Sequence, residues 1–185
     1  MKFVSIVQVE LHDETLAKEC TWKTVVLIQK VKGDFQGIGL AEVLWKAVAS
    51  LLNRRLTAEI IFHDTLHMFW VERGTGTATL NAKLILQLTA MREAVLFKVL
   101  LDLWKAYNAL EQERALDFIA VYGVGLRSVR LLRTYWYLLT IMSKAGRYFR
   151  RPFAGYRGVT QGDPLFPKIF NVVMDAIIFY WLTVL

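Results

Sequence analysis

The sequence predicts an α+β fold, in which a small number of strands are packed with helices. The run KTVVLIQK at 23–30 is apolar and β-branched, as strands are. The stretch 40–56 carries apolar residues at helical spacing, which predicts a helix with one buried face. The run 169–185 is almost wholly apolar and predicts a helix that is buried on most sides. At 185 residues the chain has room for one domain or two small ones.

The remaining elements of the first half follow from glycines and caps. KGDFQGIGL at 32–40 is predicted to be a glycine-punctuated turn. The helix over 40–56 ends in two arginines, which are favourable at a helix C-terminus. A Gly/Thr cap then begins a second helix, predicted over 73–93.

The second half begins with AVLFKVLLDL at 94–103, a compact apolar run that predicts a buried strand. Two helices are predicted next, at about 109–121 and 126–143, with YGVG between them. The segment GRYFRRPFAGYRG at 146–158 predicts a short hairpin, because glycines and a proline lie among its aromatic and basic residues.

The segment before the last helix, RGVTQGDPLFP, has the residues of a helix start. Asp163 is a good N-cap, and Pro164 then falls at the first helical position, where a missing N–H costs nothing. Gly162 allows a backbone or a ligand to approach closely. The segment therefore predicts a loop that holds Gln161 at the mouth of a buried helix, although an ordinary capped core helix has the same spacing.

Composition narrows the function classes. The formal net charge is +7 and the pI is about 9.6, which favours an anionic partner such as nucleic acid. Cys20 is the single cysteine, so a disulfide framework and a cysteine-based metal site are excluded. The N-terminus has no signal-peptide pattern, and we expect an intracellular protein. In 169–185 the charge of Asp175 near the middle favours a core helix over a membrane span.

Three groups of polar residues are candidates for chemistry. Asp102 closes the apolar run at 94–103, where a carboxylate either meets a metal or cation or caps the next turn, and both alternatives stay open. His63 and His67 have the spacing of a metal pair, but no third ligand is evident and a surface turn is favoured. Basic residues interleaved with aromatic ones suggest a surface for phosphates and bases, although a solvated basic face looks similar; they are Arg127, Arg130, Arg133, Lys144, Arg147, Arg150, Arg151 and Arg157.

The combination of LLDLWKAYNAL at 100–110 with RGVTQGDPLFPKIFN at 157–171 resembles reverse transcriptases, most closely those of non-LTR retroelements and group II introns. The resemblance covers nearly the whole chain, including 27–56 and 62–80. It implies a polymerase right hand with a fingers-like region at 1–93, a partial palm at 94–185 and no thumb. The implied reaction is RNA-templated addition of deoxynucleotides to a primer 3′-OH, with an RNA template, a DNA primer and Mg²⁺.

The resemblance also implies roles for single residues. Asp102 would be a catalytic carboxylate that binds metal, with the Leu103 carbonyl nearby. Ala106 and Tyr107 would line the nucleotide pocket, and Gln161 and Gly162 would contact the incoming nucleotide. Lys30 and Arg73 would lie near phosphates. The basic residues that we expect to bind nucleic acid are Arg127, Arg130, Arg147, Arg150, Arg151 and Arg157.

The sequence departs from the family pattern at several positions. Gln36, Met68, Trp70, Asn108 and Phe166 stand where the family commonly has arginine, glycine, arginine, aspartate and serine. The chain also ends before a Tyr-x-Asp-Asp motif would occur, and two-metal transfer needs at least two carboxylates. We therefore expect a fragment that does not polymerise. The alternatives are a non-catalytic nucleic-acid-binding module, and an interaction or membrane-associated fragment with an exposed apolar C-terminus.

Overall fold

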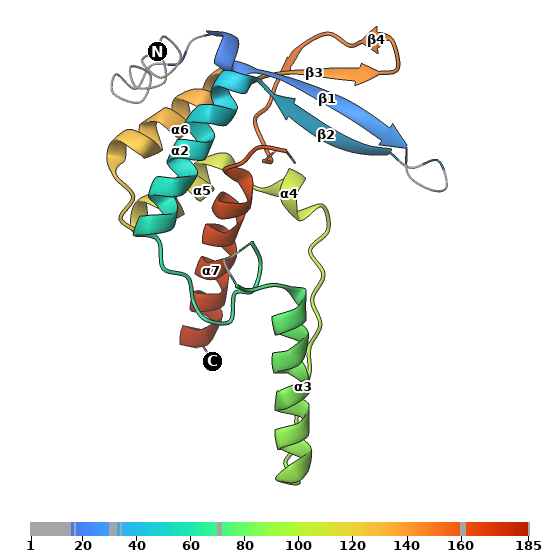
Figure 1. Ribbon diagram of the computed structural model, residues 1–185, viewed down its shortest axis with the longest axis vertical. Helices are drawn as coiled ribbons and strands as arrows, with labels where there is room; N and C mark the ends of the chain where they lie inside the picture. Colours follow the sequence, from blue (N-terminus) through green and yellow to red (C-terminus); the bar gives the residue numbers. More distant parts are fainter. Residues whose placement is uncertain are drawn as a thin grey trace.

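The computed structural model describes residues 16, 18–29, 33, 35–69, 72–159 and 162–184 (Figure 1). In this part of the chain a small mixed sheet is combined with six α-helices, which confirms the α+β class. The elements in chain order are η1 (Lys18–Thr21), β1 (Trp22–Gln29), β2 (Phe35–Ala41), α2 (Val43–Glu59), α3 (Thr75–Met91), α4 (Ala106–Ala109), α5 (Gln112–Val121), α6 (Leu126–Leu138), β3 (Thr140–Ala145), β4 (Tyr148–Phe149), β5 (Phe153–Ala154) and α7 (Phe166–Val184).

The sheet has the strand order β2-β1-β3-β4, and β5 pairs with β3 beyond β4. β1 and β2 form an antiparallel pair from Lys23↔Ala41 to Gln29↔Phe35. β1 also pairs with β3, in parallel, and this pairing joins residues more than a hundred positions apart in the sequence. Strands from both sides of residue 93 therefore share one sheet. The division into 1–93 and 94–185 stays a prediction.

The predicted glycine turn at 32–40 is wrong, because residues 35–41 form strand β2. Gly37 in this strand makes room for a side chain of the neighbouring strand. A Cβ atom at Gly37 would lie 3.0 Å from Cγ1 of Val25, so the bare backbone accommodates a β-branched side chain of β1.

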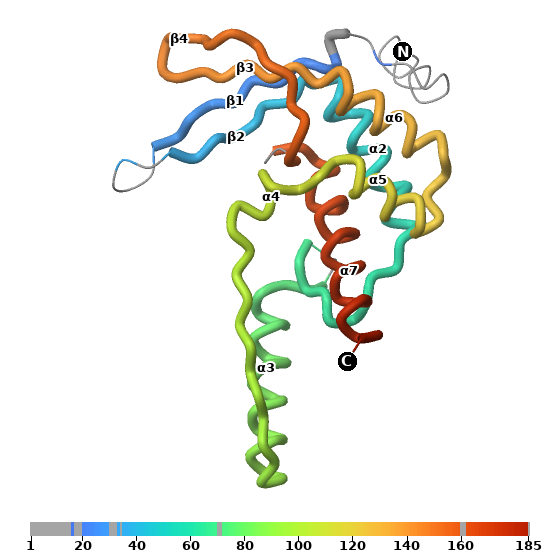
Figure 2. The backbone as a smooth tube through the Cα atoms, turned by 180° about the vertical axis from the view of Figure 1, so that it is seen from behind, coloured from blue at the N-terminus to red at the C-terminus, as the bar shows by residue number. Residues whose placement is uncertain are grey.

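The predicted buried strand at 94–103 is also wrong. Residues 94–103 form no strand, and all of them are exposed. They run back along α3, and together the two segments form an arm that projects from the rest of the molecule (Figures 1 and 2). The central strand β1 is already paired on both edges, by β2 and β3. Residues 94–103 have the composition of a buried strand, but they pair with no strand of this sheet.

The helix predicted over 126–143 ends at Leu138, and the following residues form β3. The helix predicted from 109 begins at Gln112, after the separate short helix α4. A turn at Gly146, with a φ of 60°, joins β3 to β4, so the first arm of the predicted hairpin lies before residue 146. β5 continues along β3 after a break at 150–152.

The core lies among α2, α5, α6 and α7, with the base of the sheet against it. Trp45 of α2 stacks on Tyr135 of α6, with ring centroids 3.4 Å apart and planes inclined by 2°. Both side chains are 1% exposed. Arm helix α3, in contrast, has no buried residue. The arm therefore contributes nothing to this core.

Helix α7 is buried only in its first half, as far as Val172 and Asp175. Its last turns expose Phe179, Tyr180 and Trp181. Within the described residues, α7 is the one helix long and apolar enough to cross a bilayer, and a core helix of a soluble protein has the same properties. The expected burial is thus confirmed for the N-terminal half of α7 only.

Candidate nucleotide and nucleic-acid site

The loop before α7 is bound to the segment that contains α4, 50 residues earlier in the chain. The Gly158 N–H donates to the Leu110 carbonyl at 2.8 Å, and the Val159 N–H donates to the Tyr107 carbonyl at 3.0 Å. Gly158 has a φ of 78°, and a Cβ there would lie 3.0 Å from the Asn108 backbone. The two motifs that carry the family resemblance are therefore in direct backbone contact.

Asp163 fixes the end of this loop. Its Oδ1 accepts from the Leu165 N–H at 3.0 Å, and its Oδ2 accepts from the Trp45 indole N–H at 2.6 Å. The predicted capping interaction is thus present, although α7 begins at Phe166 and not at Pro164. The Phe166 N–H bonds to the Asp163 carbonyl at 3.2 Å, so a tight four-residue turn of the 3₁₀ type leads into the helix.

Lys23 lies in the same buried region, and sequence reasoning missed it. Its side chain is 1% exposed, and its Nζ has no hydrogen-bond partner among the described residues. Burial lowers the pKa of the Lys23 ammonium to about 8, although attraction from Asp163 acts in the opposite direction. The sequence does show a lysine within an apolar strand. The alternation of side chains along the strand does not tell which face is buried, so it did not reveal that Lys23 faces the core.

Gly162 allows another backbone segment to approach closely, as expected for a glycine. It has a φ of 102°, and a Cβ there would lie 2.4 Å from the Gly39 carbonyl oxygen. The loop therefore lies directly on β2, and neither side of this contact has a side chain that could move away. Lys30 and Gln161, which the resemblance places near the nucleotide, lie outside the described residues, as does Trp70.

Tyr107 packs against α7. Its ring centroid lies 4.9 Å from that of Phe166 and 4.7 Å from that of Phe170, in tilted to edge-on geometries. Phe166 stands at the position where the family commonly has serine, so this departure supplies one of the rings that hold Tyr107. The ring is half-buried, and one part of it stays accessible.

Asp102 lies on the exposed arm, and the resemblance gives it a metal-binding role that the donor set around it does not fit. The described residues contain no group of three or more histidine, cysteine, aspartate or glutamate side chains that could hold a metal. Leu103 and Ala106 line an apolar pocket of about 260 Å³ between α4, α5 and α7, and Asp102 is not part of its wall.

Arg73 and the two histidines are engaged in local structure. The Arg73 guanidinium donates to the carbonyls of His63 and Leu66 and forms an ion pair of 2.6 Å with Asp64. His63 bonds through Nδ1 to the Thr65 hydroxyl, and His67 bonds through Nδ1 to the Thr77 hydroxyl. These contacts order the turn between α2 and α3, and they favour the surface-turn interpretation of the histidines over a metal site.

Two further polar residues fix this region, and both were missed in the sequence. The Asn171 side chain, wholly buried in α7, donates to the Met68 carbonyl at 2.5 Å. Buried Asp175 accepts from the His63 N–H at 2.8 Å and from the Tyr122 hydroxyl. Burial, and then this hydrogen bond, raise the pKa of the Tyr122 phenol well above its usual range. Asp175 is therefore satisfied inside the protein, which explains how a charge is accommodated in the apolar helix.

The predicted basic residues are exposed and fall on two surfaces. Arg127 and Arg130 lie on α6. Arg147, Arg150 and Arg151 lie on or beside the β3–β4 hairpin. Arg157 belongs to the loop that follows, where it approaches Glu111 to 3.4 Å. The hairpin arginines lie next to exposed aromatic rings, which are Tyr148 and Phe149 of β4 and Phe153 of β5.

The sequence of the chain was compared with those of known proteins and protein families. No protein-family model matches the chain. It is 28% identical over 166 residues to the retrovirus-related Pol polyprotein from type-1 retrotransposable element R2 of Nasonia vitripennis. It is also 28% identical over 146 residues to the corresponding polyprotein from type-2 element R2DM of Drosophila melanogaster. The matches support a retrotransposon reverse-transcriptase-like relationship.

The two matches cover 83% and 78% of this chain but only 15% and 14% of the relatives. The chain thus spans about one seventh of the length of each R2 polyprotein. Both relatives are retrotransposon proteins, so they support that part of the resemblance, and the resemblance to group II intron reverse transcriptases stays an expectation. The roles expected for single residues also stay predictions.

Proposed function

We propose that this chain is part of a reverse transcriptase of the non-LTR retrotransposon type, and that on its own it binds nucleic acid without polymerising. The similarity to R2 Pol polyproteins over most of the chain carries this proposal. The reaction of the complete enzyme would be RNA-templated addition of deoxynucleotides to a primer 3′-OH. In this assignment 1–93 is fingers-like, and 94–185 is the first part of a palm.

The contact between the α4 segment and the loop before α7 supports the assignment. In the proposed site Tyr107 and Gly162 lie where an incoming nucleotide would bind. The described end of this loop is held by the protein itself, because Gly162 lies against the Gly39 carbonyl and Asp163 bonds to the Trp45 indole and the Leu165 N–H. Asp102 is the single carboxylate of the chain that the resemblance assigns to metal. We therefore expect no Mg²⁺-dependent primer extension by this chain, and extension that disappears in Asp102→Ala would contradict that expectation.

The surface proposed for nucleic acid is the β3–β4 hairpin. Lys144 lies over the Phe149 ring at 5.2 Å, and Arg150 and Arg151 follow at the end of β4 with no acidic partner among the described ion pairs. Exposed cations next to exposed rings suit a strand whose phosphates and bases are both accessible. The family implies an RNA template and a DNA primer as the natural ligands.

A salt titration tests this surface. Affinity for a short single strand should fall with salt, and each phosphate contact should contribute about 0.7 to the slope of log affinity against log salt. The double variant Arg150→Glu/Arg151→Glu should lower both affinity and slope. The matched control is Arg54→Glu/Arg55→Glu, which makes the same change of charge at two exposed arginines of α2. Equal effects of the two double variants would show that net charge, and not the hairpin, determines binding.

A second candidate is a fragment that docks onto another protein, and the exposed arm favours it. Arm helix α3 and the segment 94–104 expose apolar side chains along their whole length; among them are Leu84, Ile85, Phe97, Leu100 and Trp104. The partner that we propose is the remainder of the polymerase, since the relatives are far longer than this chain. Binding to a separately produced downstream segment of the same polyprotein would support this candidate, and failure of α3 variants to affect that binding would contradict it.

A further inference from the structure

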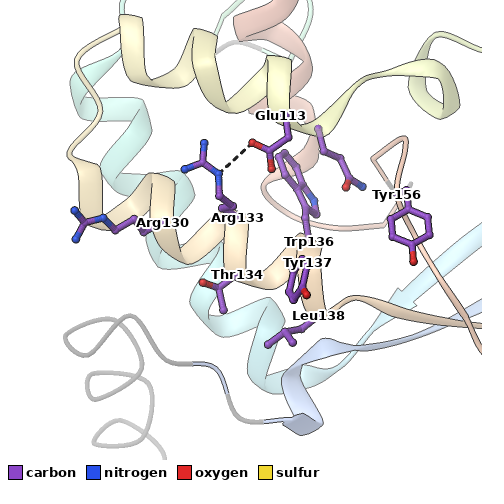
Figure 3. Close-up of a pocket in the computed structure, with 9 residues that line it drawn as sticks. Glu113, Arg130, Arg133, Thr134, Trp136, Tyr137, Leu138 and Tyr156 are labelled. Carbon is purple, nitrogen blue, oxygen red and sulfur yellow. Dashed lines mark hydrogen bonds and ion pairs between the residues drawn. The ribbon is translucent and has the colours of Figure 1, made fainter.

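A pocket of about 570 Å³ lies between α5, α6 and the loop before α7 (Figure 3). Its volume is within the range of about 300–1,000 Å³ that is usual for small-ligand sites. The residues that line it are Gln112, Glu113, Arg130, Arg133, Thr134, Trp136, Tyr137, Leu138 and Tyr156. Most of its wall is apolar or aromatic, with two arginines on one side.

One face of α6 supplies both the arginines and an aromatic ring. Arg130, Arg133 and Tyr137 follow one another at spacings of three and four residues, which places them on one side of a helix. Tyr137 is 84% exposed, so its ring is free to contact a ligand. The next residues toward the core, Trp136 and Leu132, are buried and hold this part of the helix in place.

The opposite wall carries Tyr156, whose backbone is held tightly although its ring is 81% exposed. The buried amide of Gln112 donates to the carbonyl of Gly155 at 3.2 Å and to the carbonyl of Gly158 at 2.9 Å. Gly155 itself lies so close to Ile141 that a Cβ would approach its Cδ1 to 2.6 Å. An exposed aromatic ring on a fixed backbone loses little freedom on binding, which favours affinity.

The charges around the pocket suit an anion at its rim. Arg133 Nε bonds to Glu113 Oε2 at 3.1 Å, which orients the guanidinium while about half of the side chain stays exposed. Arg130 and Arg127 add two cations on the exposed side of α6. Glu113 is the one acidic residue among the described lining residues, and it pairs with Arg133.

We propose that this pocket binds an unpaired base of a single-stranded nucleic acid, with the base stacked on Tyr137 and Tyr156 and a flanking phosphate at Arg130 and Arg133. The choice of nucleic acid rests on the proposed function, and the stacking site is new to it. Base stacking on aromatic rings tolerates any base, so the pocket gives affinity for single strands without sequence preference. The fixed loop also links this pocket to the loop residue Gly158 that contacts the α4 segment.

The test compares two probes with the whole chain: a single-stranded oligonucleotide, and an abasic strand of the same length and charge. The chain should bind the base-bearing strand more tightly. Tyr137→Ala and Tyr156→Ala should each weaken that binding about 5- to 150-fold and leave abasic binding unchanged. Tyr137→Phe keeps the ring and should behave like the parent chain. All three changes are at exposed side chains, and matching thermal unfolding curves verify that the variants fold.

The outcomes separate the pocket from the hairpin. Equal binding of both strands by the parent chain would overturn the stacking site. Alanine variants that keep the preference for bases would also overturn it. Either result would hold against the pocket even if Arg150→Glu/Arg151→Glu still abolishes phosphate binding. Retained preference for bases in that hairpin variant would support the pocket as the site that binds the base. A neutral tryptophan peptide that saturates the pocket without competing with the strand would assign it to a protein partner and would also overturn the proposal.

Discussion

Replacing Gly162 with alanine tests the close contact between the loop before α7 and strand β2. Two separate penalties apply. A φ of 102° is a conformation that costs a residue with a side chain about 1–3 kcal/mol. The new Cβ would also lie 2.4 Å from the Gly39 carbonyl oxygen, and forced overpacking of this kind costs about 1–3 kcal/mol more. Alanine restricts the unfolded chain, which returns about 0.4–1 kcal/mol.

The three terms together give an expected loss of about 1–6 kcal/mol in the free energy of unfolding, which is a sizeable part of the roughly 5–15 kcal/mol of a typical domain. Urea denaturation with a shared m-value measures it. The matched control is Gly146→Ala in the β3–β4 turn, where φ is 60° but no atom lies within 4 Å of the added Cβ. That variant should lose about 1 kcal/mol, from backbone strain alone. Equal losses at the two glycines would refute the contact with Gly39 as the source of the difference.

Three further perturbations address other parts of the structure. Tyr122→Phe removes a donor to buried Asp175 and should cost about 1–3 kcal/mol near neutral pH. Because the pKa of Tyr122 is raised in the folded state, its stabilising contribution to folding is fully present below about pH 10 and is lost as the pH rises further. Tyr122→Phe should therefore show a shallower decline of melting temperature at alkaline pH. An unchanged decline would contradict this. Lys23 has a folded pKa of about 8, below its unfolded value of 10.5, so its charge disfavours folding at neutral pH. Lys23→Met should add on the order of 3 kcal/mol at pH 7, with a gain that shrinks between pH 8 and 10.5; a gain independent of pH would be inconsistent with this account. Leu80→Lys with Leu84→Lys, at exposed positions of α3, should reduce self-association in sedimentation experiments and leave the melting temperature unchanged; a marked loss of stability would show that the arm is packed against something.

The elements that sequence alone predicted well are those fixed by local pattern. Strand β1 and helices α2 and α3 begin and end within a few residues of their predicted bounds, because β-branched runs, helical spacing and caps act over short distances. Strand β2 was missed because its glycines resemble a turn, whereas Gly37 accommodates the Val25 side chain of the adjacent strand and Gly39 lies against Gly162 of the loop before α7.

The errors came from features that depend on distant partners. Residues 94–103 have the composition of a buried strand, but a strand also needs the path of the chain to bring it alongside a sheet edge, and in the structure these residues run along α3 instead. The end of α6 was placed too late, because 140–145 becomes a strand only by pairing with β1. At the site, the capping role of Asp163 was predicted from its neighbours, whereas its bond to Trp45 joins residues 118 positions apart and left no local trace.

The parallel pairing of β1 with β3 has a consequence for how the chain is synthesised. The antiparallel β1–β2 hairpin can form as soon as residue 41 has left the ribosome, since its pairs are close in sequence. The third strand is completed more than a hundred residues later, and loop closure over that distance makes folding slow. During translation the outer edge of β1 therefore stays unsatisfied through the whole of α2 to α6. A nascent chain arrested near residue 130 should engage chaperones through that edge, and one arrested well beyond residue 154 should not.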